Sequence, residues 1–293
     1  MQKRVYEKGE INKLFVVNKP MFISSNFYLN RFKRAYKNKK AGFSGTLDPF
    51  AKGCLIVAFG QYAKLFKYLE KTPKVYKAVI WLGVTSESLD IERIQDIVIK
   101  EKLETDFIKK EIEKLKGEIE YIPPKFSAKR VNGQKAYEIA REGLEFELKS
   151  SIMKVFDIKF IRYNHPFISF EVKVSEGSYI RSLAQIFLKN IACVGTLSYL
   201  ERVSEGKFYF ENHKELNPLD FIDLPKNNYT GTKEWLEVGK RISKDYLSIK
   251  ENGKYIIELD TFFSFIYIID GEFKYLLNKV SNIEVKNYYK IIC

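Results

Sequence analysis

The residues best suited to chemistry lie in one short segment, residues 42–49, with the sequence GFSGTLDP. Gly42 and Gly45 permit backbone conformations that other residues avoid, and they allow a ligand to approach the backbone closely. Pro49 fixes its own φ angle and favours an extended conformation at Asp48. A carboxylate held on such a stiff loop can act as a nucleophile or a base. Alternatively, Asp48 caps a helix or turn that begins at Pro49, because Asp-Pro is common at helix starts.

The charge of the chain indicates a polyanionic partner. Its 50 Lys and Arg against 37 Asp and Glu give a net charge of +13 over 293 residues. Such an excess favours nucleic acid or an anionic membrane surface. The 19 Tyr and 23 Phe interleaved with basic side chains suit RNA, whose bases stack on rings while its phosphates meet Lys and Arg. A Lys-, Ile-, Asn- and Phe-rich composition can also reflect genomic base bias, so charge alone leaves the partner open.

The cysteines and histidines argue against metal chemistry. Cys54, Cys193 and Cys293 are isolated and form no CxxC pair, which predicts a reducing compartment without structural zinc. His165 and His213 lack the spacing of metal ligands, so we expect no metal. The N-terminal segment has no apolar signal core, and no apolar run approaches the roughly 18 residues of a membrane span. We therefore expect a cytoplasmic protein with no membrane partner.

Regular elements are expected on both sides of the Asp48 segment. Residues 11–19 read as a buried strand. Residues 24–26 could cap a basic helix that extends to residue 36, and residues 55–59 and 63–69 read as a strand and a helix. The apolar side of the basic helix is expected to carry Phe27, Phe32 and Ala35.

Later elements carry the other candidate side chains. Residues 74–83 predict a strand with Tyr76 on one face and apolar residues on both, so both faces could be covered. Residues 105–116 predict an amphipathic helix. Strict alternation over residues 168–175 predicts a half-buried strand, and Gly177-Ser178 turns it into a helix.

An inserted arm and a β-rich tail complete the expected architecture. Residues 126–147 form the arm, with a turn at Asn132-Gly133 and a helix around residues 136–141. Residues 217–233 are a plausible boundary. Asn252-Gly253 and Asp270-Gly271 each lie between apolar runs and predict hairpins. The basic residues of the arm are Lys125, Lys129, Arg130 and Lys135.

Several of these pieces occur together in one known family. Lys19-Pro20, the GFSGTLDP segment, Tyr76 and the GSYIR sequence at residues 177–181 resemble, in order and spacing, the TruB family of tRNA pseudouridine synthases. The resemblance runs from about residue 11 to about residue 203 and includes Ser127-Ala128-Lys129 and Leu200-Glu201-Arg202. The octapeptide around Asp48 is highly specific to that family, and the other pieces stand at matching intervals.

The resemblance implies an α+β fold and a division of the chain. The implied fold is a pseudouridine synthase fold with a mixed, mainly antiparallel sheet flanked by helices. Residues 1–235 would form the catalytic domain, with an RNA-gripping insertion at about 124–150. Residues 246–293 would form a small β-rich domain, which looks short for the RNA-binding PUA module of many family members and could be a reduced form of it.

The resemblance also implies a reaction and roles for residues. The enzyme would cleave the bond from uracil N1 to ribose C1′, turn the base and rejoin it through C5. Asp48 matches the nucleophile, Tyr76 the ring that packs on the flipped base, and Arg181 the arginine that pairs with the aspartate. Tyr179 and Leu200 match residues that line the uridine pocket, and Lys19 matches a supporting lysine. No step would need a cofactor, and the sequence contains no Walker loop and no GxGxxG.

Each of these residues also has a plain structural interpretation. Tyr76 could be an ordinary strand aromatic, Arg181 a solvated helix charge, and Tyr179 and Leu200 core residues. The basic residues of the arm could be a solvated face. Phe43 departs from the family, which usually has His there; we expect its ring to stack or wedge against the RNA.

The implied substrate is the T-stem-loop of tRNA, at the uridine of position 55. We expect a monomer that needs no protein partner. Two alternatives remain open from the sequence. One is a non-catalytic RNA-binding or tRNA-folding protein on the same scaffold, which the complete set of Asp48, Tyr76 and Arg181 argues against. The other is a pseudouridine synthase that acts on another RNA, such as a relative that depends on a guide RNA.

Overall fold

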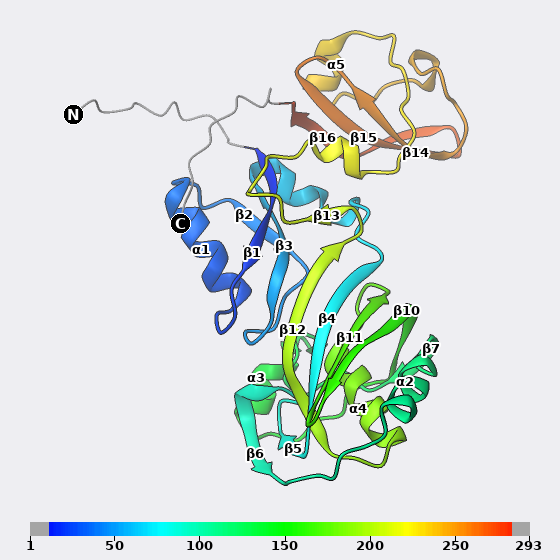
Figure 1. The fold of residues 1–293 in the computed structure, drawn as a ribbon. Coiled ribbons are helices and arrows are strands. Elements are labelled where there is room, and N and C mark those ends of the chain that lie inside the picture. The colour runs from blue at the N-terminus through cyan, green and yellow to red at the C-terminus, as the bar shows by residue number, and fades with distance from the viewer. Residues whose placement is uncertain (1–11, 283–293) are drawn as a thin grey trace, which may run out of the picture.

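The computed structural model describes residues 12–282 and has a mixed sheet of nine strands at its centre (Figure 1). Seven strands follow the order β1-β3-β12-β4-β11-β10-β7, while β2 pairs with β3 and β13 with β12. All pairs are antiparallel except the short parallel contact of β12 with β3. The expected α+β fold with a mainly antiparallel sheet is therefore confirmed. The strands are β1 (Lys13–Lys19), β2 (Ala41–Ser44), β3 (Lys52–Phe59), β4 (Lys74–Leu82), β7 (Gly117–Tyr121), β10 (Ser151–Asn164), β11 (Phe167–Val174), β12 (Gly195–Glu205) and β13 (Phe208–Tyr209).

The parallel contact of β12 with β3 depends on a glycine. Gly53 lies opposite Arg202 and has a φ angle of +110°. A Cβ atom at this position would come within 2.3 Å of the Arg202 carbonyl oxygen, so only glycine permits the approach. This contact brings the strand after the Asp48 loop against the strand that carries Leu200.

Helices cover one face of β4 and leave its other face half open. Tyr76 and the alternate residues that follow it are buried, together with α2 (Thr105–Glu113) and α4 (Ile180–Asn190), in the main core. On the opposite face Lys77 is exposed and Val79 and Trp81 are only half-buried. The expectation that both faces are covered is therefore wrong, because both of these helices pack on the same side.

Helix α1 (Ser25–Ala35) begins where the sequence predicts. The Phe27 amide donates a 3.1 Å hydrogen bond to Oγ of Ser24, which caps the helix. Leu29 and Phe32 are buried, but Phe27 is 51% exposed, so its expected place on the apolar side is wrong. The buried positions begin at Ser25, and two residues later the helix has turned about 200°, which places Phe27 on the outer face. The helix expected at 63–69 is a 3₁₀ helix, η1 (Gly60–Lys67).

The arm has the predicted hairpin and helix. Strands β8 (Arg130–Val131) and β9 (Gln134–Lys135) pair across Asn132 and Gly133, whose φ angles of 50° and 87° suit a tight hairpin. Helix α3 (Ala136–Arg141) follows directly. Beside the arm lies a small unit that the sequence analysis did not predict: β5 (Val84–Ser86), η2 (Ile91–Arg93) and β6 (Ile94–Ile97) (Figure 1).

The C-terminal part forms a separate antiparallel sheet of β14 (Gly253–Glu258), β15 (Phe262–Ile269) and β16 (Glu272–Ser281). The hairpin at Asp270-Gly271 is confirmed. The prediction of a hairpin at Asn252-Gly253 is wrong, because β14 is the first strand of this sheet and, within the described chain, no strand precedes the turn in it. Instead, the Asn252 side chain accepts a hydrogen bond from the Asp270 amide. The remainder of the expected tail domain and Cys293 lie outside the described residues. Short helices η3 (Pro218–Phe221), α5 (Lys233–Glu237) and η4 (Lys244–Tyr246) lead into this sheet.

The C-terminal sheet shares a core with the large sheet. Leu14 of β1 and Ile56 of β3 pack in one buried cluster with Phe263 and Phe265 of β15. The Ser281 amide also donates a 3.1 Å hydrogen bond to the side-chain carbonyl of Gln61 in η1. Within residues 12–282 no helix has the length and apolar character needed to cross a membrane.

Candidate active site

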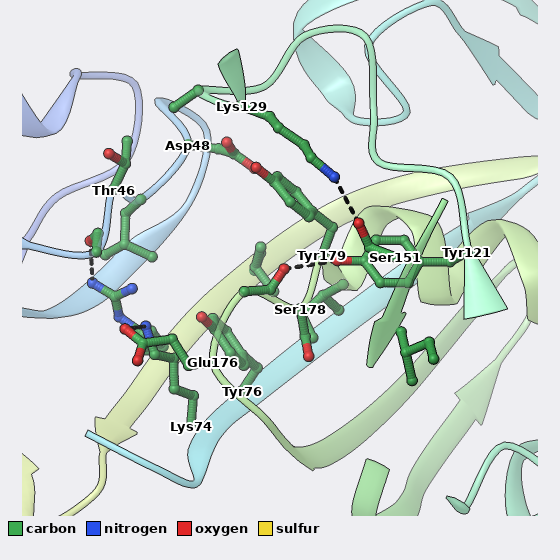
Figure 2. A pocket seen from close by; sticks show the side chains of 18 residues that line it. Thr46, Asp48, Lys74, Tyr76, Tyr121, Lys129, Ser151, Glu176, Ser178 and Tyr179 are labelled. Atoms are coloured by element: carbon green, nitrogen blue, oxygen red, sulfur yellow. Dashed lines mark hydrogen bonds and ion pairs between the residues drawn. The ribbon is translucent and has the colours of Figure 1, made fainter. Parts of the chain in front are cut away.

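A cavity of about 540 Å³ opens where the arm faces the middle of the large sheet. Its walls come from the loop after β2, the strands β4 and β12, the turn before α4, and the arm (Figure 2). Five of the residues singled out in the sequence line it: Asp48, Tyr76, Lys129, Tyr179 and Leu200. The structure therefore gathers into one site residues that are more than 150 positions apart along the chain.

Arg181 holds the Asp48 carboxylate at the wall of this cavity. Its Nε atom lies 2.9 Å from Oδ2 of Asp48, whose side chain is 26% exposed, while the arginine is 2% exposed. The Nη1 atom donates to the carbonyl of Ser88 at 2.7 Å and meets Oδ2 of Asp90 at 3.3 Å. The Nη2 atom donates to the carbonyl of Phe126 in the arm at 2.9 Å. Arg181 is thus a buried, multiply bonded guanidinium, and the solvated-charge interpretation is wrong.

The backbone of the Asp48 loop is fastened to β1 and α1. The Leu47 amide donates to Oγ of Ser25 and the Leu47 carbonyl accepts from the same hydroxyl, both at 3.0 Å. The Lys19 ammonium donates to the Pro49 carbonyl at 3.2 Å and to the Ile23 carbonyl at 2.8 Å. A turn does begin at Pro49, and the Ala51 amide closes it with a 3.1 Å hydrogen bond to the Asp48 carbonyl. Because β3 follows this turn, the helix alternative is wrong and the turn alternative is present.

The Lys19 side chain is fully buried beneath this loop. Burial lowers the pKa of Lys19 to about 8, and the nearby Asp48 carboxylate opposes that shift. Its hydrogen bonds to three backbone carbonyls join the end of β1 to the Asp48 loop. This geometry supports the expected site-supporting role and places the ammonium behind the cavity wall, outside its lining.

A buried charge cluster lies under the turn at Gly45. Arg202 donates to the carbonyls of Gly45 at 2.9 Å and Cys54 at 2.8 Å, and its Nη2 atom lies 2.7 Å from Oε1 of Glu205. The ammonium of Lys74 lies 3.2 Å from Oε2 of Glu205. Gly45 has a φ angle of +64°, and a Cβ atom there would lie only 3.1 Å from Nζ of Lys74. The tight fit of glycine against these charges fixes the start of the Asp48 loop.

Aromatic rings make up much of the remaining wall. Tyr76 points into the cavity from β4, and Tyr179 lies at the N-terminal end of α4 (Figure 2). Tyr121 packs 6.3 Å from the Tyr179 ring and donates a 2.7 Å hydrogen bond to the Gly177 carbonyl. Burial raises the pKa of Tyr76, and the nearby Arg202 charge opposes part of that rise. Burial also raises the pKa of Tyr121, to about 12. These phenols are neutral at neutral pH, so they can stack on a base and donate hydrogen bonds.

Comparison with known proteins identifies the family. A model of the TruB family pseudouridylate synthase N-terminal domain matches residues 33–180. A tRNA pseudouridine synthase B of Sulfurovum sp. (strain NBC37-1) is 52% identical over 274 residues, which is 94% of this chain and 99% of that protein. One of Campylobacter jejuni (strain RM1221) is 51% identical over 270 residues, 92% of this chain and 99% of that protein. The chain belongs to the TruB family.

Solved structures agree with the fold of this TruB-family chain. A Cbf5-Nop10-Gar1 complex contains a chain that matches with a TM-score of 0.61 at 18% identity, over 92% of this chain and 84% of that one. A chain of an archaeal box H/ACA sRNP Nop10-Cbf5 complex matches with a TM-score of 0.61 at 19% identity, over 95% and 88%. At this identity the likeness concerns the fold alone.

Of the four basic residues predicted for RNA binding, one lines the cavity and three do not. Lys129 lines the cavity and donates a 2.6 Å hydrogen bond to Oγ of Ser151 (Figure 2). Lys125 and Arg130 are exposed, and Lys135 is half-buried and lies 3.8 Å from a carboxylate oxygen of its helix neighbour Glu138. Lys125, Arg130 and Lys135 lie outside the cavity lining, so any RNA contact they make involves the outer surface of the arm.

Phe43 also lies outside the cavity lining in this TruB-family chain. It is half-buried in β2, pairs with Val57 of β3 and packs against the main core. Phe43 lies on β2, the strand that leads directly into the Asp48 loop, so it is near Asp48 in the sequence. The expected contact with RNA stays a prediction.

Sequence reasoning missed four buried charged residues of the site: Lys74, Asp90, Arg202 and Glu205. Asp90 lies between β5 and η2 and forms an ion pair with Arg181. Burial raises the pKa of Asp90, and the Arg181 charge opposes that rise. Arg202 and Glu205 lie three residues apart near the end of β12. Arg202 was visible only as part of the LER sequence that carries the family resemblance, with no role attached. The sequence offers no other signal for them, because a charged residue in a loop or strand is exposed far more often than buried.

Proposed function

We propose that this chain isomerises uridine to pseudouridine at position 55 in the T-loop of tRNA, with Asp48 as the nucleophile. The observation that carries the proposal is the pairing of Asp48 with the buried Arg181, 2.9 Å apart, at the wall of an aromatic-lined cavity. The relatives that match along nearly the whole chain bear the name tRNA pseudouridine synthase B. In this proposal the protein acts on free tRNA in the cytoplasm, as a monomer without a partner protein.

The reaction is an isomerisation in which atoms balance without a co-reactant. The bond from ribose C1′ to uracil N1 breaks, and a bond from C1′ to C5 forms after the base has turned. N1 gains a proton and C5 loses one, so nothing is oxidised or consumed. Asp48 would meet the electron-poor C1′ as the first bond breaks, and Arg181 would hold that carboxylate in the correct orientation through their 2.9 Å ion pair.

The cavity can hold a base only after it leaves the RNA stack. Flipping costs a few kcal/mol of lost stacking. In this proposal the ring of Tyr76 packs on the flipped uracil and recovers about 1–3 kcal/mol. Tyr179 and Leu200 close the pocket around the base, and Lys19 supports the loop from behind.

The remaining parts of the chain would supply RNA contacts. We propose that residues 1–235 are the catalytic domain and that its insertion at 124–150 grips the T-stem-loop through Lys125, Lys129, Arg130 and Lys135. Of these, Lys129 reaches the cavity, which supports a contact beside the flipped nucleotide. Phe43 would pack against the distorted loop of the RNA. Residues 246–293 would form the small second domain.

The test uses purified protein and unmodified tRNA, followed by site-specific mapping of pseudouridine. We expect the wild type to modify the T-loop uridine at position 55. The Asp48→Asn variant should abolish the reaction while tRNA affinity stays within a few-fold of wild type, because one carboxylate is removed from a broad basic surface. The control is Asp96→Asn, which removes an exposed carboxylate of β6 outside the cavity. Turnover by Asp48→Asn near the wild-type rate would refute the nucleophile, and modification at another uridine would refute the substrate.

A further inference from the structure

Phe22, in the turn between β1 and α1, combines two features that folding stability disfavours. Its side chain is 64% exposed to solvent. Its φ angle is +64°, in the left-handed region where a bulky residue is strained and glycine is not. Glycine would relieve both costs, whereas most polar residues would relieve only the cost of exposure. Residues held in a strained backbone conformation cluster at active sites and ligand-binding sites.

The turn that carries Phe22 is fastened to the catalytic loop. The Phe22 amide donates a 2.7 Å hydrogen bond to the carbonyl of Pro49, the residue after Asp48. The Lys19 ammonium bridges the same Pro49 carbonyl to the carbonyl of Ile23, on the other side of Phe22. The ring is therefore carried on a backbone that moves with the nucleophile.

The surroundings of Phe22 suit RNA. One turn into α1, Phe27 is a second exposed ring, and the Arg31 guanidinium lies 5.4 Å from its centroid. The first turn of α1 has no acidic residue, while Lys33 and Arg34 follow in its last turn. Exposed rings among cations suit a partner with bases and phosphates, such as single-stranded RNA, better than they suit a partner with an apolar protein surface.

We propose that Phe22 is a stacking platform for an unpaired base of the substrate RNA, next to the nucleotide that enters the cavity. This rests on the proposed function only in taking RNA as the substrate. When one nucleotide leaves the stack, its neighbours lose a stacking partner, and an exposed ring fixed beside the nucleophile replaces it. Phe43, half-buried against the core, presents less of its ring to such a base.

The test compares Phe22→Gly, Phe22→Leu and Phe22→Trp with the wild type in single-turnover kinetics on unmodified tRNA. Loss of one stacked base raises the half-saturating RNA concentration about tenfold in the Gly and Leu variants. The rate at saturating RNA stays within about twofold, and the Trp variant binds like the wild type, because an indole also stacks. The melting temperature of Phe22→Gly is equal to or above that of the wild type, since glycine relieves the left-handed backbone.

The control is Asn212→Gly, which relieves a φ angle of 45° at an exposed residue after β13 without removing a ring. It should leave RNA binding unchanged. Half-saturating concentrations of the Gly and Leu variants equal to wild type would overturn the proposal, as would a lower melting temperature of Phe22→Gly with normal binding, which would make Phe22 a packing residue. Direct tRNA binding is measured alongside turnover. If the wild type binds tRNA but modifies no uridine, the proposed function fails, and the Phe22 variants still report on stacking through binding.

Discussion

Replacing Glu205 with glutamine tests whether the buried charge cluster under the Gly45 turn holds the Asp48 loop in place. Glu205 is fully buried, and its two carboxylate oxygens lie 2.7 Å from Arg202 and 3.2 Å from Lys74. Glutamine keeps the shape of the side chain and removes its charge. Arg202 and Lys74 are then left in the core as like charges without their shared counter-ion.

The size of the expected effect follows from this burial. Removing one partner of a buried ion pair costs about 3–5 kcal/mol, because the other charge stays desolvated. For a chain of this size each kcal/mol lowers the melting temperature by roughly 2–4 °C, so Glu205→Gln should lose about 6–20 °C. The single-turnover rate at a temperature where the variant is folded should also fall, since Arg202 no longer holds the Gly45 carbonyl in one position.

The assay is thermal unfolding followed by circular dichroism, with Glu201→Gln as the matched control on the same strand. Glu201 pairs with Lys52 at 3.8 Å, and its side chain is 28% exposed. Such a surface pair contributes about 0–1 kcal/mol. In the Glu205→Gln background, Lys74→Met should recover part of the lost stability. It removes a buried charge whose remaining carboxylate neighbour, Glu176, lies 3.8 Å away and is 54% exposed. The reasoning is refuted if Glu205→Gln lowers the melting temperature no more than Glu201→Gln does. It is also refuted if the melting temperature of the double variant falls by the sum of the losses measured for Glu205→Gln and Lys74→Met alone.

Three further predictions concern the tail, Phe43 and Lys19. Deleting the chain after Tyr246 should lower the urea midpoint strongly, because it uncovers Ile56 of β3, and not merely weaken tRNA binding; an unchanged midpoint would contradict the shared core. Phe43→Ala should weaken productive tRNA binding by about 1–3 kcal/mol and Phe43→His should restore much of it, whereas single-turnover parameters of Phe43→Ala equal to wild type would leave only a packing role. Burial lowers the pKa of Lys19 from 10.5 to about 8, so between those pH values the unfolded chain binds a proton that the folded chain has lost. Urea unfolding at both ends of this window should therefore show the wild type gaining stability with pH relative to Lys19→Met, and a constant difference would refute the shift.

The sequence pattern predicted correctly those elements whose formation depends on residues adjacent in the chain. The continuous apolar run of β1, the Ser24 cap of α1 and the Asn132-Gly133 turn of the arm each depend on neighbours in the sequence, and each is present. Asn252-Gly253 failed because a turn dipeptide predicts a hairpin only if the strands on both sides pair with each other. That pairing is set by the sheet as a whole, which starts at β14.

The site was predictable only where the family motif covers it. Asp48 and Arg181 could be paired on the resemblance, although nothing local distinguishes Arg181 from a surface arginine. Asp90, Arg202 and Glu205 depend on burial, which arises when β12, β4 and the arm meet in three dimensions. The packing of the C-terminal sheet on β1 and β3 has the same origin, since an apolar strand does not specify what covers it.

The position of Asp48 is a property of the whole fold, because its loop is held from four separate elements. Lys19 holds it from β1, Ser25 from α1, Arg181 from α4 and Arg202 from β12. β3, which follows the loop, is backed on one face by the main core and on the other by the C-terminal sheet. Because these anchors share one short loop, loss of any one lets the others relax, and substitutions at two of them should not be additive. In the proposed reaction the Asp48 carboxylate must meet C1′ in a closely defined geometry, and redundant support of the loop would provide it. That requirement would account for the buried charges, because apolar residues often serve a purely structural role equally well.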